Sequence, residues 1–244
     1  MFKLHTIFIT GASGCGKSTL ALKLGKYLEQ RNVSVALFNQ DDYFTMPFIP
    51  YKDRHDISYE TSSGIDFHKL KSDIESKASD IIARQTPNPD KSILLVDIVI
   101  IVEGHMLGAA AEMLCESCTK IVDGKIVNSL STVCVLMQCS KEKCKQRRLG
   151  RRSRPKEEWE ELNQYIDEYV WIGFEQYGVP ALDSFRACVN NIQAQKIEIE
   201  KQDQKQQQYH SNASIVEVSS EEDDNLEQSL DVILKALNKG DDNI

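Results

Sequence analysis

Short apolar runs alternate along this chain with longer amphipathic segments. The apolar runs are rich in aliphatic and β-branched residues, which is typical of strands that are buried on both faces of a parallel sheet. The third run is longer than one buried strand requires. The pattern predicts five strands, at residues 4–10, 33–38, 92–102, 132–138 and 213–218.

The intervening segments carry apolar residues at helical spacing. Residues 17–31 place Leu20, Leu24 and Leu28 on one face, as in an amphipathic helix. A further helix is predicted to begin at Pro155, since proline is well suited to the first turn of a helix. The other predicted elements are helices at residues 65–84, 106–118, 141–148 and 226–237, and a small hairpin at residues 120–127.

Strands that alternate with helices predict an α/β fold, in which helices cover both faces of a parallel sheet. The chain has 244 residues, which is enough for one such domain with a full core. We therefore expect a single domain spanning residues 1–244, built on a five-stranded parallel sheet. The segment 188–212 is rich in Gln and Lys towards its end, and is expected to be an insertion that forms an exposed helix or remains partly disordered.

Charge and composition limit the partners. The net charge of -8 argues against nucleic acid as the main partner, because binding to a phosphate backbone normally needs a basic face. The most apolar run is interrupted by Asp97 and is too short to span a bilayer, and the N-terminus has no signal-peptide pattern. Seven scattered cysteines indicate reduced thiols. We expect a cytoplasmic or nuclear protein without a membrane partner; its oligomeric state stays open, with a monomer slightly favoured.

Residues 11–18 read Gly-Ala-Ser-Gly-Cys-Gly-Lys-Ser and match the P-loop pattern G-x-x-x-x-G-K-S/T at every fixed position. A strand precedes the loop and a helix follows it, as this motif requires. Such a loop turns its backbone N–H groups towards phosphate oxygens, and the helix adds its positive dipole end. Lys17 would reach the β- and γ-phosphates, and the Ser18 hydroxyl would bind Mg²⁺. The residues predicted to bind ATP here are Gly11, Ser13, Gly14, Cys15, Gly16, Lys17, Ser18 and Thr19.

The P-loop alone is shared by kinases, switch GTPases and ATPases. The sequence contains neither the Asn-Lys-x-Asp motif of GTPases nor the Leu-Ser-Gly-Gly motif of transporter ATPases. Asp41 follows the second predicted strand and Glu103 ends the third, at the edge of the sheet where ligands bind in such folds. An acid at the end of an apolar strand packs poorly but suits a Mg²⁺ site.

Several segments resemble the nicotinamide riboside kinases, within the wider uridine kinase group, and they occur in the same order along the chain. The resemblance covers most of the sequence. It implies a doubly wound P-loop kinase with a short lid at about residues 147–176. The segments that carry it are 39–44 (Asn-Gln-Asp-Asp-Tyr-Phe), 59–67, 100–104 (Ile-Ile-Val-Glu-Gly), the Arg-rich 143–151, 165–171 and 214–230.

The resemblance implies that ATP and Mg²⁺ are used to phosphorylate the 5′-hydroxyl of nicotinamide riboside, or of nicotinic acid riboside, in NAD salvage. It assigns Asp41 the roles of catalytic base, substrate contact and Mg²⁺ ligand through water, beside Glu103 and Ser18. Lys17 and Arg148 would be catalytic with it.

The resemblance also places residues around the substrate and the phosphates. Arg148 and Arg151 would close from the lid onto ATP, and Arg148 would touch the substrate as well. Tyr59 would stack on the nucleobase, and Glu60 would accept hydrogen bonds from the ribose hydroxyls. Two departures concern this part: Glu60 stands where the family has Asp, and Trp159 is the one candidate for a second lid aromatic.

Two alternatives remain open. One is a uridine or cytidine kinase, although the lid lacks that group's Arg-Asp-x-x-x-Arg-Gly run. The other is a non-catalytic nucleotide-binding interaction protein that uses the Gln-rich segment to bind a partner. Cys15 lies near a helix N-terminus and a lysine, which can lower a thiol pKa, so it is a candidate oxidation-sensitive site or simply a small residue tolerated in the loop. His105 directly follows Glu103-Gly104 and could face the active site, but the interpretation as a structural histidine is preferred.

Overall fold

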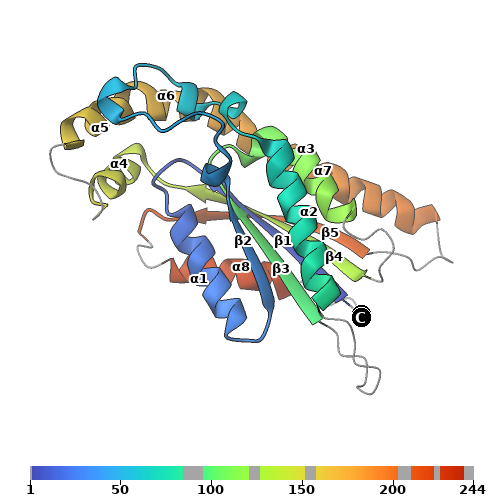
Figure 1. Cartoon of the computed structure of the whole chain (residues 1–244). Coiled ribbons are helices and arrows are strands. Elements are labelled where there is room, and N and C mark those ends of the chain that lie inside the picture. The colour runs from blue at the N-terminus through green and yellow to red at the C-terminus, as the bar shows by residue number, and fades with distance from the viewer. Residues whose placement is uncertain are drawn as a thin grey trace.

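The computed structural model describes residues 2–84, 96–120, 127–151, 158–202, 210–222 and 226–238. A five-stranded sheet in the order β2-β3-β1-β4-β5 forms its centre, and every neighbouring pair of strands is parallel (Figure 1). The predicted α/β class and parallel sheet are confirmed. The strands are β1 (Phe2–Gly11), β2 (Ser34–Asn39), β3 (Val96–Glu103), β4 (Val127–Gln138) and β5 (His210–Ser219).

Helices cover both faces of the sheet. Helices α1 and α8 lie on one face, and α2, α3 and α7 lie on the other (Figure 1). The helices are α1 (Lys17–Glu29), α2 (Phe67–Arg84), α3 (Ala111–Lys120), α4 (Lys141–Leu149), α5 (Trp159–Tyr165), α6 (Trp171–Gly173), α7 (Val179–Gln202) and α8 (Glu227–Asn238).

Strand β1 divides its side chains between two hydrophobic cores, because successive residues of a strand point to opposite faces. Leu4 and Phe8 pack in the core under α2, α3 and α7, whereas Ile7 and Ile9 pack in the core with α1 and α8. Burial on both faces explains the nearly continuous apolar runs of the sequence. The parallel register places the ends of β1, β2, β3 and β4 at one edge of the sheet, where the site forms.

A cap lies beyond this edge. Helix α5 continues through the π-helical turns η7 (Ile166–Val170) and η8 (Phe174–Gly178), with α6 between them, into α7. Leu162, Tyr165, Ile166 and Val170 form a small third core against Tyr51 of the short helix η2 (Tyr51–Asp53). The segment after β2 and the helix after α4 are therefore held together above the sheet.

Two predicted segments begin at different residues in the sequence-based prediction and in the structure. Strand β4 begins at Val127, five residues before the predicted start, and most of the predicted hairpin (121–126) lies outside the described residues, as does Pro155. The range interpreted as an insertion, 188–212, begins inside α7, where Cys188 and Val189 are core residues. The remainder of α7 continues the same helix to Gln202, and β5 begins at His210.

Candidate active site

The P-loop wraps around the start of α1. Gly14 and Gly16 have φ angles of 96° and 103°, in the left-handed region that glycine adopts without strain. A Cβ atom on Gly14 would lie 2.5 Å from the backbone oxygen of Cys144, so α4 packs directly on the loop. The ammonium of Lys17 donates to the carbonyl oxygens of Gly11 (3.1 Å) and Ala12 (2.9 Å), within reach of the loop's interior.

Ser18 and Glu103 meet beside this loop. The Ser18 hydroxyl hydrogen-bonds the Glu103 carboxyl group, whose pKa is raised by burial and is pulled back in part by Lys17. Glu103 is paired in register with Ile9 and Asn39, so the ends of β1, β2 and β3 meet there. A hydroxyl and a carboxylate placed side by side are hard oxygen ligands, and they fit a Mg²⁺ ion.

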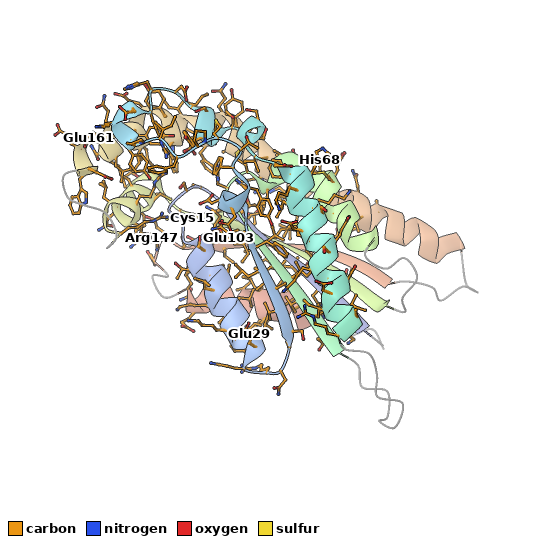
Figure 2. The ribbon with its side chains drawn as sticks, viewed as in Figure 1. Cys15, Glu29, His68, Glu103, Arg147 and Glu161 are labelled. Carbon is orange, nitrogen blue, oxygen red and sulfur yellow. The ribbon has the colours of Figure 1, made fainter. Side chains whose placement is uncertain are left out.

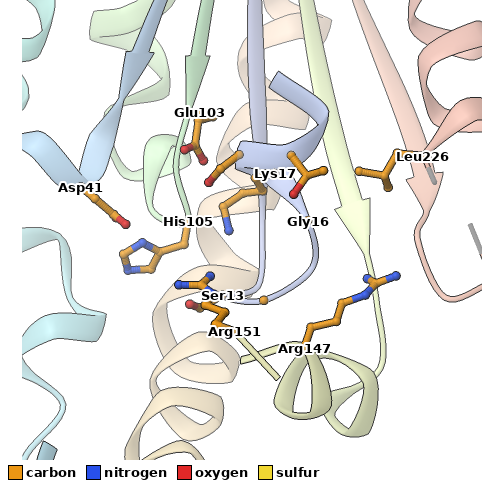
Figure 3. Close-up of a pocket in the computed structure, with 12 residues that line it drawn as sticks. Ser13, Gly16, Lys17, Asp41, Glu103, His105, Arg147, Arg151 and Leu226 are labelled. Atoms are coloured by element: carbon orange, nitrogen blue, oxygen red, sulfur yellow. The ribbon is translucent and has the colours of Figure 1, made fainter. Parts of the chain in front are cut away.

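A cavity of about 330 Å³ opens between the P-loop and the end of β2. Figure 3 shows Asp41, Glu103 and His105 to the left of Lys17, Arg151 below it beside Ser13, and Arg147 on α4 to the right. Its walls are Ser13, Gly14, Gly16, Lys17, Ser18, Thr19, Asp41, Glu103, His105, Arg147, Arg151 and Leu226. Most of the residues predicted to bind ATP thus line one cavity. Gly11, Cys15 and Arg148 do not line it, and Arg148 lines a second cavity instead.

A second cavity of about 410 Å³ adjoins the first. The two share Ser13, Asp41, His105 and Arg151, so Asp41 faces both. Apart from Met46, the remaining walls of the second cavity are aromatic or charged. They are Phe44, Met46, Phe48, Tyr51, Arg54, Tyr59, Glu60 and Arg148. Every predicted substrate residue therefore lies around one space.

Gln40 joins the strand ends that carry Asp41 and Glu103. Its side chain is fully buried, and its Oε1 accepts a hydrogen bond from the backbone N–H of Met106 (2.9 Å). Its Nε2 lies 3.4 Å from Nδ1 of His105. Sequence analysis missed this residue, although it directly precedes Asp41 at the end of an apolar strand.

The interpretation of His105 as merely structural is wrong, because the ring lines both cavities. Burial lowers the pKa of His105 to about 4, with Lys17 acting in the same direction, so the ring is neutral at pH 7. Since Nδ1 faces the Gln40 amide, Nε2 carries the proton. Nε2 is buried without a hydrogen-bond partner among the described residues and lies 3.8 Å from Oε2 of Glu60. The backbone of Tyr59 also interacts with this ring and raises its pKa against the larger effect of burial.

Glu60 lies at the floor of the second cavity and is 6% exposed. Burial raises its pKa to about 7, although Arg148 and Arg54 act against the shift. Gly173 of α6 lies directly behind it, because a Cβ there would be 2.5 Å from the Cβ of Glu60. Arg148 is also buried, and its Nε and Nη1 have no hydrogen-bond partner in the described ranges.

Tyr59 was predicted to stack on the nucleobase, but its ring is not free on both faces. Its hydroxyl donates to the carbonyl oxygen of Pro47, and the guanidinium carbon of Arg54 lies 4.0 Å from its ring centroid. One side of the ring is thus covered by a cation. Trp159 is 39% exposed and lines neither cavity, so it does not supply a second aromatic there; Phe44 and Tyr51 do.

Of the two interpretations of Cys15, the surroundings of the thiol favour a small residue tolerated in the loop over an oxidation-sensitive site. Burial raises the pKa of this thiol above its usual value, and this outweighs the opposing effect of Lys17. The thiol points into the core while the loop backbone is held from outside: Ser220 donates to the carbonyl oxygen of Cys15 (2.7 Å), and Arg147 donates to the Ser220 carbonyl oxygen (2.6 Å). Figure 2 shows Cys15, Glu103 and Arg147 gathered at this end of the sheet, away from Glu29 at the other end of α1.

No group of three or more metal-ligating His, Cys, Asp or Glu side chains occurs within the part of the chain that the structure describes. No helix in the same ranges is both long and apolar enough to cross a membrane.

Of the comparisons with known proteins, the family match agrees with the fold. The family model described as "AAA domain" matches residues 7–167. Among solved structures, a protein described as a fructose transport system kinase from Silicibacter sp. TM1040 matches with 15% identity and a TM-score of 0.37, over 76% of this chain and 85% of its own. An uncharacterized protein from Eubacterium ventriosum matches with 12% identity and a TM-score of 0.35, over 96% of this chain and 98% of its own. At these scores neither structure bears on the substrate. The search of curated proteins found no match.

Proposed function

Since this chain belongs to the AAA-domain family, whose model matches residues 7–167, we propose that it is a P-loop kinase that transfers a phosphoryl group from ATP to a small hydroxyl-bearing substrate. The specific substrate that we propose is nicotinamide riboside or nicotinic acid riboside, phosphorylated on the 5′-hydroxyl. The observation that carries the proposal is the pair of adjoining cavities that share Asp41.

The first cavity suits the triphosphate. Phosphoryl transfer needs neutralised charge and an in-line hydroxyl rather than extensive covalent chemistry from the protein. Lys17 and the backbone of the loop would hold the phosphates, and Ser18 and Glu103 would hold Mg²⁺, which supplies charge neutralisation when bound. Arg151 lines both cavities and would approach the transferred group.

The second cavity suits the acceptor. Asp41 faces both spaces, so its carboxylate can take the proton from a hydroxyl that lies between them. Glu60 and the Nε2–H of His105 offer an acceptor and a donor to a ribose diol. Phe44, Tyr51 and Tyr59 offer apolar contact to a flat ring.

A coupled ADP-release assay with Mg²⁺·ATP tests the proposal. The panel is nicotinamide riboside, nicotinic acid riboside, uridine, cytidine and adenosine. Turnover of the pyridine ribosides supports the full proposal. Turnover of uridine or cytidine alone keeps the kinase and replaces the substrate. ATP binding without stimulation by any nucleoside contradicts the proposal and supports a non-catalytic nucleotide-binding protein.

A further inference from the structure

A single arginine occupies the aromatic part of the second cavity. The guanidinium carbon of Arg54 faces four rings, which we call the Arg54 cage. Aromatic rings attract a cation over their faces, so the cage holds this guanidinium in a defined place. The distances from the guanidinium carbon to the ring centroids are 4.0 Å for Tyr59, 4.6 Å for Tyr51, 5.1 Å for Phe48 and 5.4 Å for Tyr165.

Polar contacts fix Arg54 further without neutralising it. Its Nε donates to the carbonyl oxygen of Ile49 (2.7 Å), and its charge lowers the pKa of the Tyr165 hydroxyl against the larger effect of burial. No carboxylate oxygen in the described ranges lies within 4.0 Å of an Arg54 nitrogen. The protein therefore positions a partly buried cation at the wall of the cavity and gives it no direct counter-ion there.

The charged residues around the second cavity also favour a ligand that carries a negative charge. Its walls carry Arg54, Arg148 and Arg151 against two carboxyl groups, Asp41 and Glu60. Because the pKa of Glu60 is about 7, that carboxyl is only partly ionised near neutral pH. Under the proposed function, Arg151 and Arg148 serve the phosphates, and Arg54 remains as a cation next to the acceptor. A partly desolvated cation gains most from a ligand that brings a negative charge.

We propose that Arg54 is a specificity-determining residue, which selects an acceptor whose flat ring carries a carboxylate over the same ring with a carboxamide. This inference rests on the proposed function. A guanidinium binds a carboxylate through two parallel hydrogen bonds, and a carboxamide cannot accept both. The cage rings that could stabilise a positively charged ring already face Arg54, so a ring with a net positive charge meets repulsion instead.

Equilibrium binding separates these possibilities. Isothermal titration calorimetry is carried out on the full chain with Mg²⁺ and a non-hydrolysable ATP analogue, using nicotinic acid riboside and nicotinamide riboside as a matched pair. We expect the wild-type chain to bind nicotinic acid riboside roughly 10-fold tighter, or more, than nicotinamide riboside. A ratio of this size corresponds to the typical contribution of one hydrogen bond to a charged group. Arg54→Gln should weaken the acid by roughly 10- to 100-fold and change the amide by less than about 3-fold. Arg54→Lys keeps the positive charge but lacks the planar pair of donors. Its affinity for the acid should therefore lie between those of wild type and Arg54→Gln.

A matched control comes from the other end of the sheet. Arg31 lies over the ring of Tyr27, with 3.5 Å between the guanidinium carbon and the ring centroid, and it lines neither cavity. Arg31→Gln also removes an arginine from an aromatic ring, and should leave both affinities unchanged. Equal weakening of acid and amide in Arg54→Gln would show that Arg54 only supports the cage, and would overturn the inference. A wild-type preference for the amide, or no binding of either compound, would overturn it as well.

ADP release measured on the same samples distinguishes this inference from the proposed function. Acid binding that depends on Arg54, without ADP release, would refute the kinase and keep the selective pocket. Turnover of both ribosides with equal kcat/KM in wild type and Arg54→Gln would keep the kinase and refute the role of Arg54.

Discussion

The ionisation of Glu60 should make the stability of this protein depend on pH in a way that one substitution removes. The pKa of Glu60 is about 7 in the folded chain and 4.5 for an ordinary glutamate. A folded-state pKa above the unfolded value means that the native state binds the proton more tightly. The resulting stability is fully present below about pH 4.5 and is lost as the pH rises through about 7.

The magnitude follows from the two pKa values. Their difference corresponds to roughly 3 kcal/mol of unfolding free energy, and most of it falls between about pH 5 and about pH 8. His105 acts in the opposite direction, because its pKa falls from 6.5 to about 4, and stability is gained as the pH rises through that range. The wild-type profile alone therefore mixes two effects, and the comparison with Glu60→Gln isolates the first.

Urea unfolding followed by tryptophan fluorescence provides the measurement. We expect the unfolding free energy of Glu60→Gln, relative to wild type, to rise by roughly 2 to 3 kcal/mol from about pH 5 to about pH 8. Glu160→Gln, which changes an exposed carboxyl on α5, serves as the matched control and should give a nearly constant difference. If the difference for Glu60→Gln is equally constant with pH, Glu60 is not held neutral by burial and the reasoning fails.

Four further predictions concern the first cavity. Asp41→Asn should keep ATP affinity within about 3-fold and lower turnover by roughly 100-fold or more in the ADP-release assay, whereas Asp42→Asn should stay near wild type. Gly14→Ala should lower the free energy of unfolding by about 1 to 3 kcal/mol and weaken ATP binding, measured by urea unfolding and calorimetry; an unchanged affinity would contradict the close packing of α4. Gln40→Leu removes an acceptor from a buried N–H and should lower the free energy of unfolding by about 1 to 3 kcal/mol in urea unfolding, and an unchanged free energy would argue that Gln40 does not join the two strand ends. Cys15 should stay unmodified by iodoacetamide in the native protein, as seen by mass spectrometry, since its pKa is raised by burial; rapid labelling would contradict this.

The sheet and the phosphate loop were predictable because their signals are local. Burial on both faces leaves a continuous apolar run for each strand, and the loop needs glycine at fixed positions before Lys17. Asp41 and Glu103 could be paired in advance because parallel strands bring their carboxyl ends to one edge. The structure places Lys17, Asp41 and Glu103 around the same cavity.

The rest of the site depends on contacts between distant segments. Arg54 lies in a segment without regular periodicity, and only the packing of η2 against the helix of Tyr165 surrounds it with rings. Gln40 matters through Met106, which is distant in sequence. The two interpretations of Cys15 could not be separated from sequence, because a strand-loop-helix pattern shows the helix dipole but does not show whether the side chain faces solvent or core.

The two π-helical turns give the cap a dependence on chain length. A π turn holds one residue more than the matching α turn, and each residue of an α-helix advances by about 100° around its axis. Gly173 lies between η7 and η8 and forms the wall behind Glu60. Loss of one codon within Ile166–Val170 would restore an ordinary turn and leave Gly173 behind Glu60, whereas the same loss within α5 would rotate Gly173 away by about 100° and present another side chain to Glu60. The shape of the acceptor pocket can thus change through a single-residue deletion that leaves every lining residue intact.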